Sequence, residues 1–485
     1  MKWSISMAAV LLVACGGGTS FKSREELLDS QTCKECHQDH YREWSGSMHA
    51  YASDDPVFLA MNARGQRETE GQLGPFCVKC HAPMALREGA TTDGLDLASV
   101  AAPLKGVTCF FCHSVNSVEG THNNPLGLAD DLVMRGEYDD PVDNDAHRSA
   151  YSPLHDRDQA DSAALCGTCH DIVVDESAAI ERTYTEWQAS VFSQAGGATC
   201  GQCHMDQSPN LRPIADADNV AARRFHSHMF PAIDVALTPD FPEADAQREA
   251  VTKFLDTTLQ SALCVVPTSG GAAIRVVLDN VAAGHGFPSG SAQDRRVWAE
   301  VIAYQGEEAI YGSGVVPEAQ PVTVEPDPDL WLLRDCMLDA DGAPVSMFWQ
   351  AQDYETNQLP AQTTFDPNDP DFYKTHVVQF YPREPTALLD FIPDRVTLRV
   401  LVQPMGLEVL DELVESGDLA ADVASRMPTY EVDLGDGPIL EWTAETADQQ
   451  YIDEDINQPA QCISLTNLNA GADKVPAVNH SACQP

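Results

Sequence analysis

The chain has 485 residues, 43% of them hydrophobic, so it is long enough to bury at least two cores and we expect more than one domain. Its 74 acidic residues outnumber its 29 basic residues, which gives a formal net charge of −45. Such a charge argues against nucleic acid and anionic lipid as partners. It suits either high solubility or the steering of basic partner proteins.

The first residues indicate an export signal. Met1-Lys-Trp3 precedes an apolar run from Ile5 to Val13, and the run ends in Leu12-Val-Ala-Cys15. We predict that residues 1–18 are a lipoprotein signal peptide and the start of a tether, with a lipid on Cys15. The alternative is a short buried helix, but the charged start, a run too short to cross a bilayer and the small residue before Cys15 favour export. From the signal peptide we expect the protein to be exported and lipid-anchored, in the periplasm or at the outer membrane.

One motif, Cys-x-x-Cys-His, occurs five times between residues 33 and 204. Two thiols at this spacing can bind both vinyl groups of one porphyrin, while the adjoining histidine reaches the iron. We therefore predict five haem c groups. Their attachment residues are Cys33, Cys36, Cys77, Cys80, Cys109, Cys112, Cys166, Cys169, Cys200 and Cys203, and their proximal ligands are His37, His81, His113, His170 and His204.

A single motif of this kind can also be half of a zinc site or a redox dithiol. Zinc sites do not require a histidine directly after every second cysteine, whereas all five copies have one. Five copies in an exported chain therefore favour haem.

The segment 19–231 contains every motif and is predicted to be a helical and loop-rich cytochrome domain with haems forming much of its core. It also holds an internal repeat: Tyr41-Arg-Glu-Trp44-Ser-Gly-Ser47-Met-His49 follows the first motif, and Tyr184-Thr-Glu-Trp187-Gln-Ala-Ser190-Val-Phe192 follows the fourth. We expect each unit to form one or two helical turns that pack an aromatic ring against a porphyrin edge.

The segment 232–264 is predicted to be a helical connector, because apolar residues recur at helical spacing between Asp245 and Cys264. Residues 265–485 are predicted to be mainly β and to form a sandwich. Their β-branched and aromatic runs are 274–278, 296–304, 376–381 and 396–402, and a short helix is expected near 406–417. The cysteines after the motif-bearing segment are even in number, as two disulfides require, and three pairings are open: they are Cys264, Cys336, Cys462 and Cys483.

An iron that transfers electrons without binding substrate needs a second axial ligand. His49, twelve residues after His37, is the first choice. His228 is favoured over His226 behind the fifth motif, and glycines on both sides of His285 allow a flat group to approach. The remaining candidates lie in polar loops between the third and fourth motifs and are His122, His147 and His155.

With these residues in view, the chain from about Gln31 to Arg296 resembles the multihaem c-type cytochromes related to the tetrahaem electron acceptor of hydroxylamine oxidoreductase. The matching features are the run from Cys36 to His49, Gly106-Val-Thr-Cys109, and Gly284-His285 followed by Phe287-Pro-Ser-Gly290. The resemblance implies closely stacked haems, a periplasmic or outer-surface location and electron transfer. Phe192, in place of a second repeat histidine, departs from complete ligation by paired histidines.

Three functions follow as hypotheses. The first is an electron carrier between donors and acceptors of the cell envelope, with redox proteins as its partners. The sequence is also compatible with a homo-oligomer. The second is an oxidoreductase in which one open haem acts on a small nitrogen or sulfur oxyanion. Pentahaem nitrite reductases typically have Cys-x-x-Cys-Lys, which is absent here. A subunit of an extracellular haem filament is a third possibility, against which the lipid anchor argues.

Overall fold

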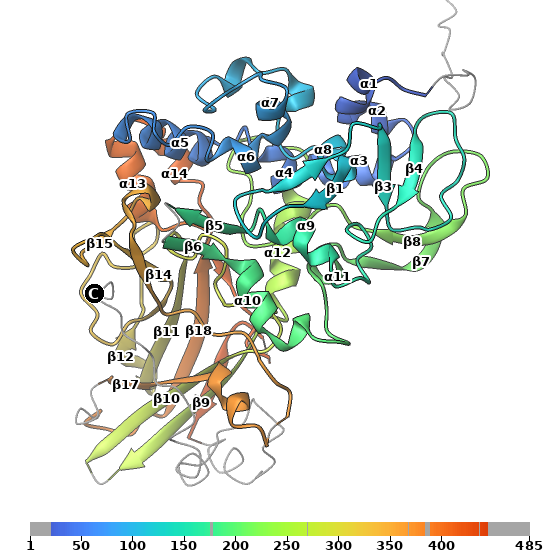
Figure 1. The fold of residues 1–485 in the computed structure, drawn as a ribbon. Helices are drawn as coiled ribbons and strands as arrows, with labels where there is room; N and C mark the ends of the chain where they lie inside the picture. The colour runs from blue at the N-terminus through green and yellow to red at the C-terminus, as the bar shows by residue number, and fades with distance from the viewer. Residues whose placement is uncertain are drawn as a thin grey trace, which may run out of the picture.

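The computed structural model describes residues 21–174, 178–268, 270–366, 368–383, 389–435 and 437–444. It has a motif-bearing region of short helices and small sheets, followed by a strand-rich region (Figure 1). The predicted signal peptide with Cys15, and the cysteines Cys462 and Cys483, lie outside the described residues. No helix of the described part is both long and apolar enough to cross a bilayer.

The motif-bearing region is built from short helices. They are α1 (Arg24–Leu28), α2 (Ser30–Lys34), α3 (Gln38–Ser45), α4 (Met48–Tyr51), α5 (Pro56–Glu68), α6 (Val78–His81), α7 (Pro83–Arg87), α8 (Cys109–Ser114), α9 (Ser162–Gly167), α10 (Thr183–Ala189) and α11 (Cys200–His204). Capping residues fix where the motif helices begin: Thr108 accepts the backbone N–H of Phe111, and Thr199 accepts that of Gln202. The motifs thus begin or end single helical turns that could not bury a core by themselves.

Small two-stranded sheets connect these helices, which the sequence did not lead us to expect. The pairs are β1 (Val115–Val118) with β2 (Leu126–Leu128), β3 (Val133–Gly136) with β4 (Arg148–Tyr151), β5 (Asp171–Val174) with β6 (Ala178–Arg182), and β7 (Gln207–Pro213) with β8 (Ala222–His226). Strands of three to seven residues are too short to show a clear alternation in the sequence.

The predicted helical connector is only partly helical. Helix α12 (Ala244–Leu255) ends after three turns, and the second half of the predicted helix is strand β9 (Leu259–Thr268). Strand β9 pairs with β10 (Gly271–Asn280) over its whole length. Ten cross-strand pairs therefore override the helical spacing of the apolar residues, and Cys264 lies buried in the sheet.

The strand-rich C-terminal region is confirmed. One sheet has the order β17 (His376–Tyr381), β10, β9, and a second has β12 (Glu308–Ser313), β11 (Arg296–Gln305), β18 (Arg395–Gln403), β19 (Tyr430–Glu431), with β13 (Trp331–Leu333) and β20 (Leu440–Thr443) also attached. A third contains β15 (Pro344–Val345), β14 (Asp335–Leu338) and β16 (Asp353–Thr356). All four predicted strand runs lie in these strands.

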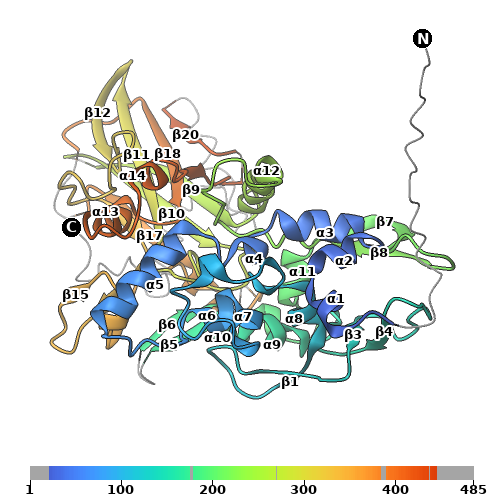
Figure 2. The same ribbon diagram turned by 90° about the horizontal axis from the view of Figure 1, so that it is seen from above.

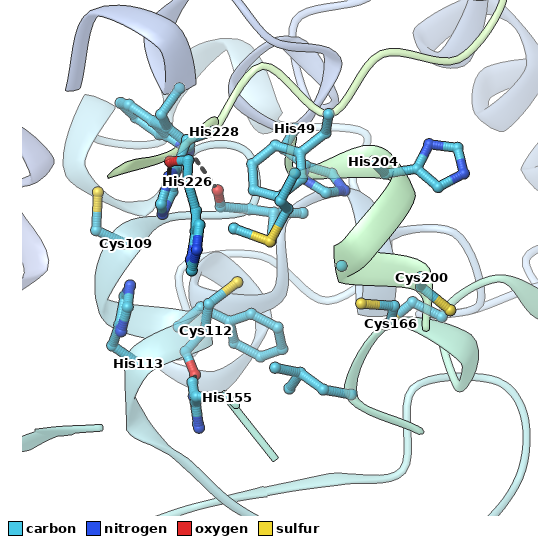
Figure 3. Close-up of a pocket in the computed structure, with 18 of the residues that line it drawn as sticks. His49, Cys109, Cys112, His113, His155, Cys166, Cys200, His204, His226 and His228 are labelled. Atoms are coloured by element: carbon cyan, nitrogen blue, oxygen red, sulfur yellow. Dashed lines mark hydrogen bonds between the residues drawn. The ribbon is translucent and has the colours of Figure 1, made fainter. Parts of the chain in front are cut away.

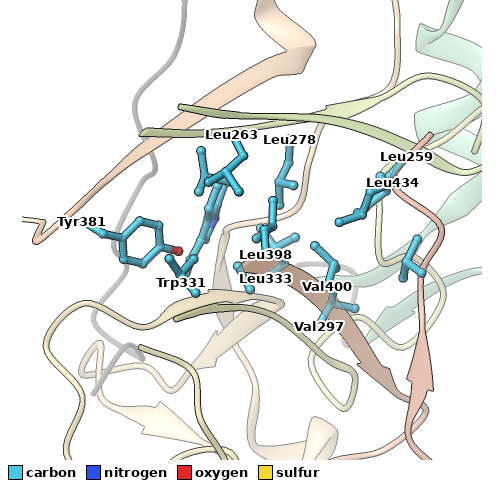
Figure 4. Packing of buried hydrophobic residues seen from close by; sticks show 14 of the residues in the cluster. Leu259, Leu263, Leu278, Val297, Trp331, Leu333, Tyr381, Leu398, Val400 and Leu434 are labelled. Carbon is cyan, nitrogen blue, oxygen red and sulfur yellow. The ribbon is translucent and has the colours of Figure 1, made fainter. Parts of the chain in front are cut away.

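The first two sheets share one hydrophobic core (Figure 4). On β11 the residues Val297, Ala299 and Val301 enter this core, while the intervening Trp298 packs in a separate cluster. This period of two is the reason that the strand is well predicted from its sequence. The more specific expectation of a sandwich stays a prediction.

The C-terminal helices return to the motif-bearing region. Helix α13 (Leu407–Glu415), which was expected near 406–417, and α14 (Ala421–Ala424) lie beside α5 (Figures 1 and 2). Leu410 and Leu413 of α13 pack with Val57 and Ala60 of α5. The two regions are therefore joined by a shared apolar cluster.

Candidate functional site

A cavity of about 1900 Å³ runs through the motif-bearing region and reaches the β region. Pockets for one small ligand usually measure about 300–1,000 Å³, so this cavity is larger than a single ligand needs. All ten motif cysteines and all five motif histidines line it. The five motifs therefore face one shared space rather than five separate sites.

Thiols of different motifs lie close together in this cavity. Cys33 is hydrogen-bonded to Cys109, Cys80 to Cys169, and Cys166 to Cys200. These contacts join the first motif to the third, the second to the fourth, and the fourth to the fifth. Because each cysteine marks the attachment edge of one porphyrin, groups bound at these motifs would lie in contact or nearly so.

The motif histidines are held by their backbone surroundings. In four of these five rings, Nδ1 lies 2.5–3.1 Å from a backbone carbonyl oxygen. A carbonyl oxygen can only accept a hydrogen bond, so Nδ1 carries the proton in these rings. The acceptors belong to Ile214 for His37, Ala52 for His81, Arg135 for His113 and Pro231 for His204. The Nε2 lone pair is then available for a metal in each ring.

Three motif histidines face another histidine at the separation expected across a metal. Two imidazoles bound on opposite faces of one metal, each about 2 Å from it, have ring centres roughly 6 Å apart. The observed separations are 6.3 Å for His37 and His147, 6.3 Å for His49 and His170, and 6.4 Å for His204 and His285. The structure therefore brings three of the predicted distal residues to three different motifs.

These imidazoles are neutral, as metal ligands must be. Burial lowers the pKa of His49 to about 3 and, helped by neighbouring histidines, the pKa of His170 and His204 to about 4. Burial likewise lowers the pKa of His285, His37 and His147. The donor set thus fits haem iron, and within the described residues no group of three or more His, Cys, Asp or Glu is arranged to hold a metal ion by itself, as zinc would require.

His113 of the third motif has several histidines nearby. The ring of His155 lies 5.7 Å from it; Nε2 of His155 binds the carbonyl of Cys112, and its buried Nδ1 has no hydrogen-bond partner among the described residues. In the view of Figure 3, His226 and His228 lie on one side of Cys112 and His155 on the other. His228 keeps Nε2 available, because its Nδ1 lies 3.0 Å from the carbonyl oxygen of His226.

His40 also lines this part of the cavity and was not among the predicted ligands. Its ring lies 4.7 Å from His228 and 5.8 Å from His37, and burial lowers its pKa to about 2. Its position three residues after His37 places both on one side of a helical turn, which is the signal that could have drawn attention to it.

His81 of the second motif differs from the others. The ring stacked on it belongs to Phe58, with centroids 4.0 Å apart and planes 5° apart. Among the described residues, no histidine ring is paired with His81 as His147 is with His37.

Two other histidines have different surroundings. His122 is exposed, is not part of the cavity lining and is hydrogen-bonded to Thr121. This position is at odds with its predicted role as a ligand. His226, which was ranked below His228, lines the cavity, and its Nδ1 lies 2.9 Å from a carboxylate oxygen of Glu137.

Comparison with known proteins gives two matches. Residues 32–114 match the family model described as cytochrome c554 and c-prime. The chain is also similar in fold to a penta-heme cytochrome c552 from Thermochromatium tepidum, with a TM-score of 0.57 and 17% sequence identity over 86% of this chain and 99% of that one. No match to a curated protein was found. The motifs, the lining of the cavity and these two similarities agree on one kind of site, a site for covalently bound haem.

Proposed function

We propose that the protein binds five haem c groups and transfers electrons through them in the cell envelope. The observation that carries this proposal is the connection between motifs: five Cys-x-x-Cys-His sites line one cavity, and thiol contacts join the first to the third, the second to the fourth, and the fourth to the fifth. The third and fourth motifs also interact electrostatically, because burial and then the charges of Cys109 and Cys166 raise the pKa of Cys112. These interactions between cysteines thus link all five motifs in one continuous series.

The chain's own residues would hold each iron in a fixed coordination. Haem supplies an iron that gains and loses one electron, and ligation by two histidines leaves no position for a substrate. His147, His49 and His285 would be the distal ligands for the first, fourth and fifth motifs, and His228 would be the distal ligand for the third. Backbone carbonyls hold the proximal rings, so little has to move when an electron arrives.

The location and the partners belong to the same proposal. A lipid on Cys15 would tether the protein to a membrane, in the periplasm or at the outer membrane. The net charge of −45 would attract redox proteins with basic surfaces. Cys264 and Cys336 are buried in the β region, and the two disulfides expected among these residues, Cys462 and Cys483 stay a prediction with three open pairings.

Mass spectrometry and electron paramagnetic resonance of the purified holoprotein test the proposal. The intact mass should equal the processed chain plus five haems, and the ferric spectrum should show low-spin iron at the motifs that have paired histidines. A mass without covalent haem, or high-spin iron at most sites, would overturn the carrier function.

A second candidate function rests on His81. Since no histidine of the described residues is paired with it, the iron of the second motif is the one at which an enzyme acting on a nitrogen or sulfur oxyanion would bind its substrate. One high-spin haem that binds nitrite or hydroxylamine, and loses this binding in Cys77→Ser/Cys80→Ser, would favour the enzyme over the carrier.

A further inference from the structure

The two repeat units form the same structure twice. Trp44 of α3 donates its indole N–H to the carbonyl of Val107 at 2.8 Å, and Trp187 of α10 donates to the carbonyl of Ala198 at 2.8 Å. Each of these carbonyls lies two residues before the first cysteine of the next repeat-linked motif, Cys109 or Cys200. The tryptophans therefore fix the third and fifth motifs in the same way.

Two further contacts also occur in both repeat units. Ser47 and Ser190 each donate a hydroxyl hydrogen bond of 2.7 Å to the carbonyl of their own tryptophan. The first cysteine of the preceding motif lies against the first cysteine of the following one in both units, Cys33 with Cys109 and Cys166 with Cys200. A two-haem unit thus occurs twice, with motifs one and three in the first copy and motifs four and five in the second.

The repeat glutamates, Glu43 and Glu186, have corresponding partners as well. Oε2 of Glu43 accepts the backbone N–H of His228 at 2.8 Å, and its carboxylate also accepts from Ser227. Oε2 of Glu186 accepts the backbone N–H of Gly286 at 3.0 Å and the hydroxyl of Ser289 at 2.7 Å. Each carboxylate thus binds one backbone N–H and one serine.

The partners of these carboxylates are far away in the sequence and unrelated to each other. Glu43 is separated from His228 by 185 residues, and Glu186 from Gly286 by 100. One loop follows strand β8, and the other belongs to the β region. The shared property of the two loops is that each carries a histidine facing the cavity, His228 or His285. A purely structural tie between helix and loop would not require this coincidence.

We propose that Glu43 and Glu186 are positioning residues that hold the loops of His228 and His285 against the irons of the third and fifth motifs. This inference rests on the proposed function, in which His228 serves the third motif. In the second copy the connection is direct: Gly286 gives its N–H to Glu186, and its carbonyl lies 2.8 Å from Nδ1 of His285. Glu186 therefore fixes the residue that orients the ring.

Glutamine is the conservative replacement for Glu186. Both loop donors bind the same oxygen, Oε2, so the single amide oxygen of glutamine can accept both. Alanine removes the acceptor and leaves two donors without a partner. Glu186→Ala should then release His285 from its iron, whereas Glu186→Gln should not.

The test measures the ferric spin state of the holoprotein by electron paramagnetic resonance. His285→Ala provides the spectrum for loss of this ligand and should add one high-spin haem to the wild-type number. We expect Glu186→Ala to reproduce that spectrum, Glu186→Gln to keep the wild-type spectrum, and Glu43→Ala to match His228→Ala instead. Glu300→Ala is the control, because Glu300 is a buried, ion-paired carboxylate on β11, and it should change no haem.

A wild-type spectrum in folded Glu186→Ala, with a changed one in His285→Ala, would overturn the positioning role and leave the proposed function intact. An unchanged spectrum in His285→Ala would overturn both, because His285 would not be a ligand. If Glu186→Ala fails to take up haem, Ser289→Ala removes only one of the two donors. It should then convert part of the fifth haem to high spin, and full retention of the low-spin signal would refute the proposal.

Discussion

The contact between the two regions provides a quantitative prediction at Arg182, the last residue of β6. Its guanidinium donates to Asp335 at 2.6 Å, to Gln358 at 2.9 Å and to the carbonyl of Ala179 at 2.9 Å, and it lies 4.0 Å from the ring centre of Tyr354. The side chains of Arg182 and Asp335 are only 11% and 2% exposed. This buried ion pair joins the motif-bearing region to β14.

Arg182→Met keeps most of the apolar stem and removes the charge. Breaking a buried pair by removing one partner typically costs about 3–5 kcal/mol, because the remaining charge is left uncompensated. Burial raises the pKa of Asp335, and the guanidinium of Arg182 opposes this rise. Without the arginine the carboxyl takes up a proton more readily, so the loss of stability should be larger at pH 8 than at pH 5.

Urea denaturation of the holoprotein, followed by circular dichroism of the strands, measures this cost. Asp335→Asn in the Arg182→Met background should recover part of the lost stability, because it removes the unpaired charge. Arg182→Phe/Asp335→Leu would test whether an apolar pair can replace the ion pair. A loss below about 1 kcal/mol in Arg182→Met, the range of exposed ion pairs, would refute the reasoning.

Three further predictions concern single sites. His147→Ala should add one high-spin haem to the ferric spectrum, because its ring faces His37 across the cavity, whereas His122→Ala should add none. Burial raises the pKa of Glu181 from 4.5 to about 7, so its contribution to stability is complete below pH 4.5 and is lost as pH rises to about 7. The loss is at most about 3 kcal/mol, and urea midpoints between pH 5 and 8 should fall less steeply in Glu181→Gln. Leu410→Ala, fully buried between α13 and α5, should lower the free energy of unfolding by about 2–5 kcal/mol, and a loss within the error of the denaturation curve would contradict the shared cluster.

The sequence is most informative where chemistry or periodicity is local. Cys-x-x-Cys-His defines the residues that line the cavity, and alternation in β11 and β18 predicts their strands. The pairing of histidine rings is not local: His49 follows His37 of the first motif by only twelve residues, yet its ring faces His170 of the fourth. Strand β9 was missed for the same reason, because its structure depends on pairing with β10 rather than on its own apolar spacing.

The duplication also explains why Phe192 occupies the position at which the first repeat unit has a histidine. In the first copy this position is His49, which faces His170, the first motif histidine of the second copy. The sequence has no third copy of the repeat, so the corresponding residue of the second copy has no further motif histidine to face. Phe192 instead packs beside the loop of His285, where a Cβ on Gly284 would lie 3.8 Å from its ring.

The second motif lies outside this duplication. It is inserted between motifs one and three, and no motif occupies the corresponding place between motifs four and five. Its histidine, His81, is also the one for which no paired histidine is found among the described residues. Of the two repeat units, only the first has a histidine at its last position, His49, and this ring faces His170, so the units hold none for the inserted motif. The doubt that Phe192 raised about complete ligation therefore belongs to the second motif instead.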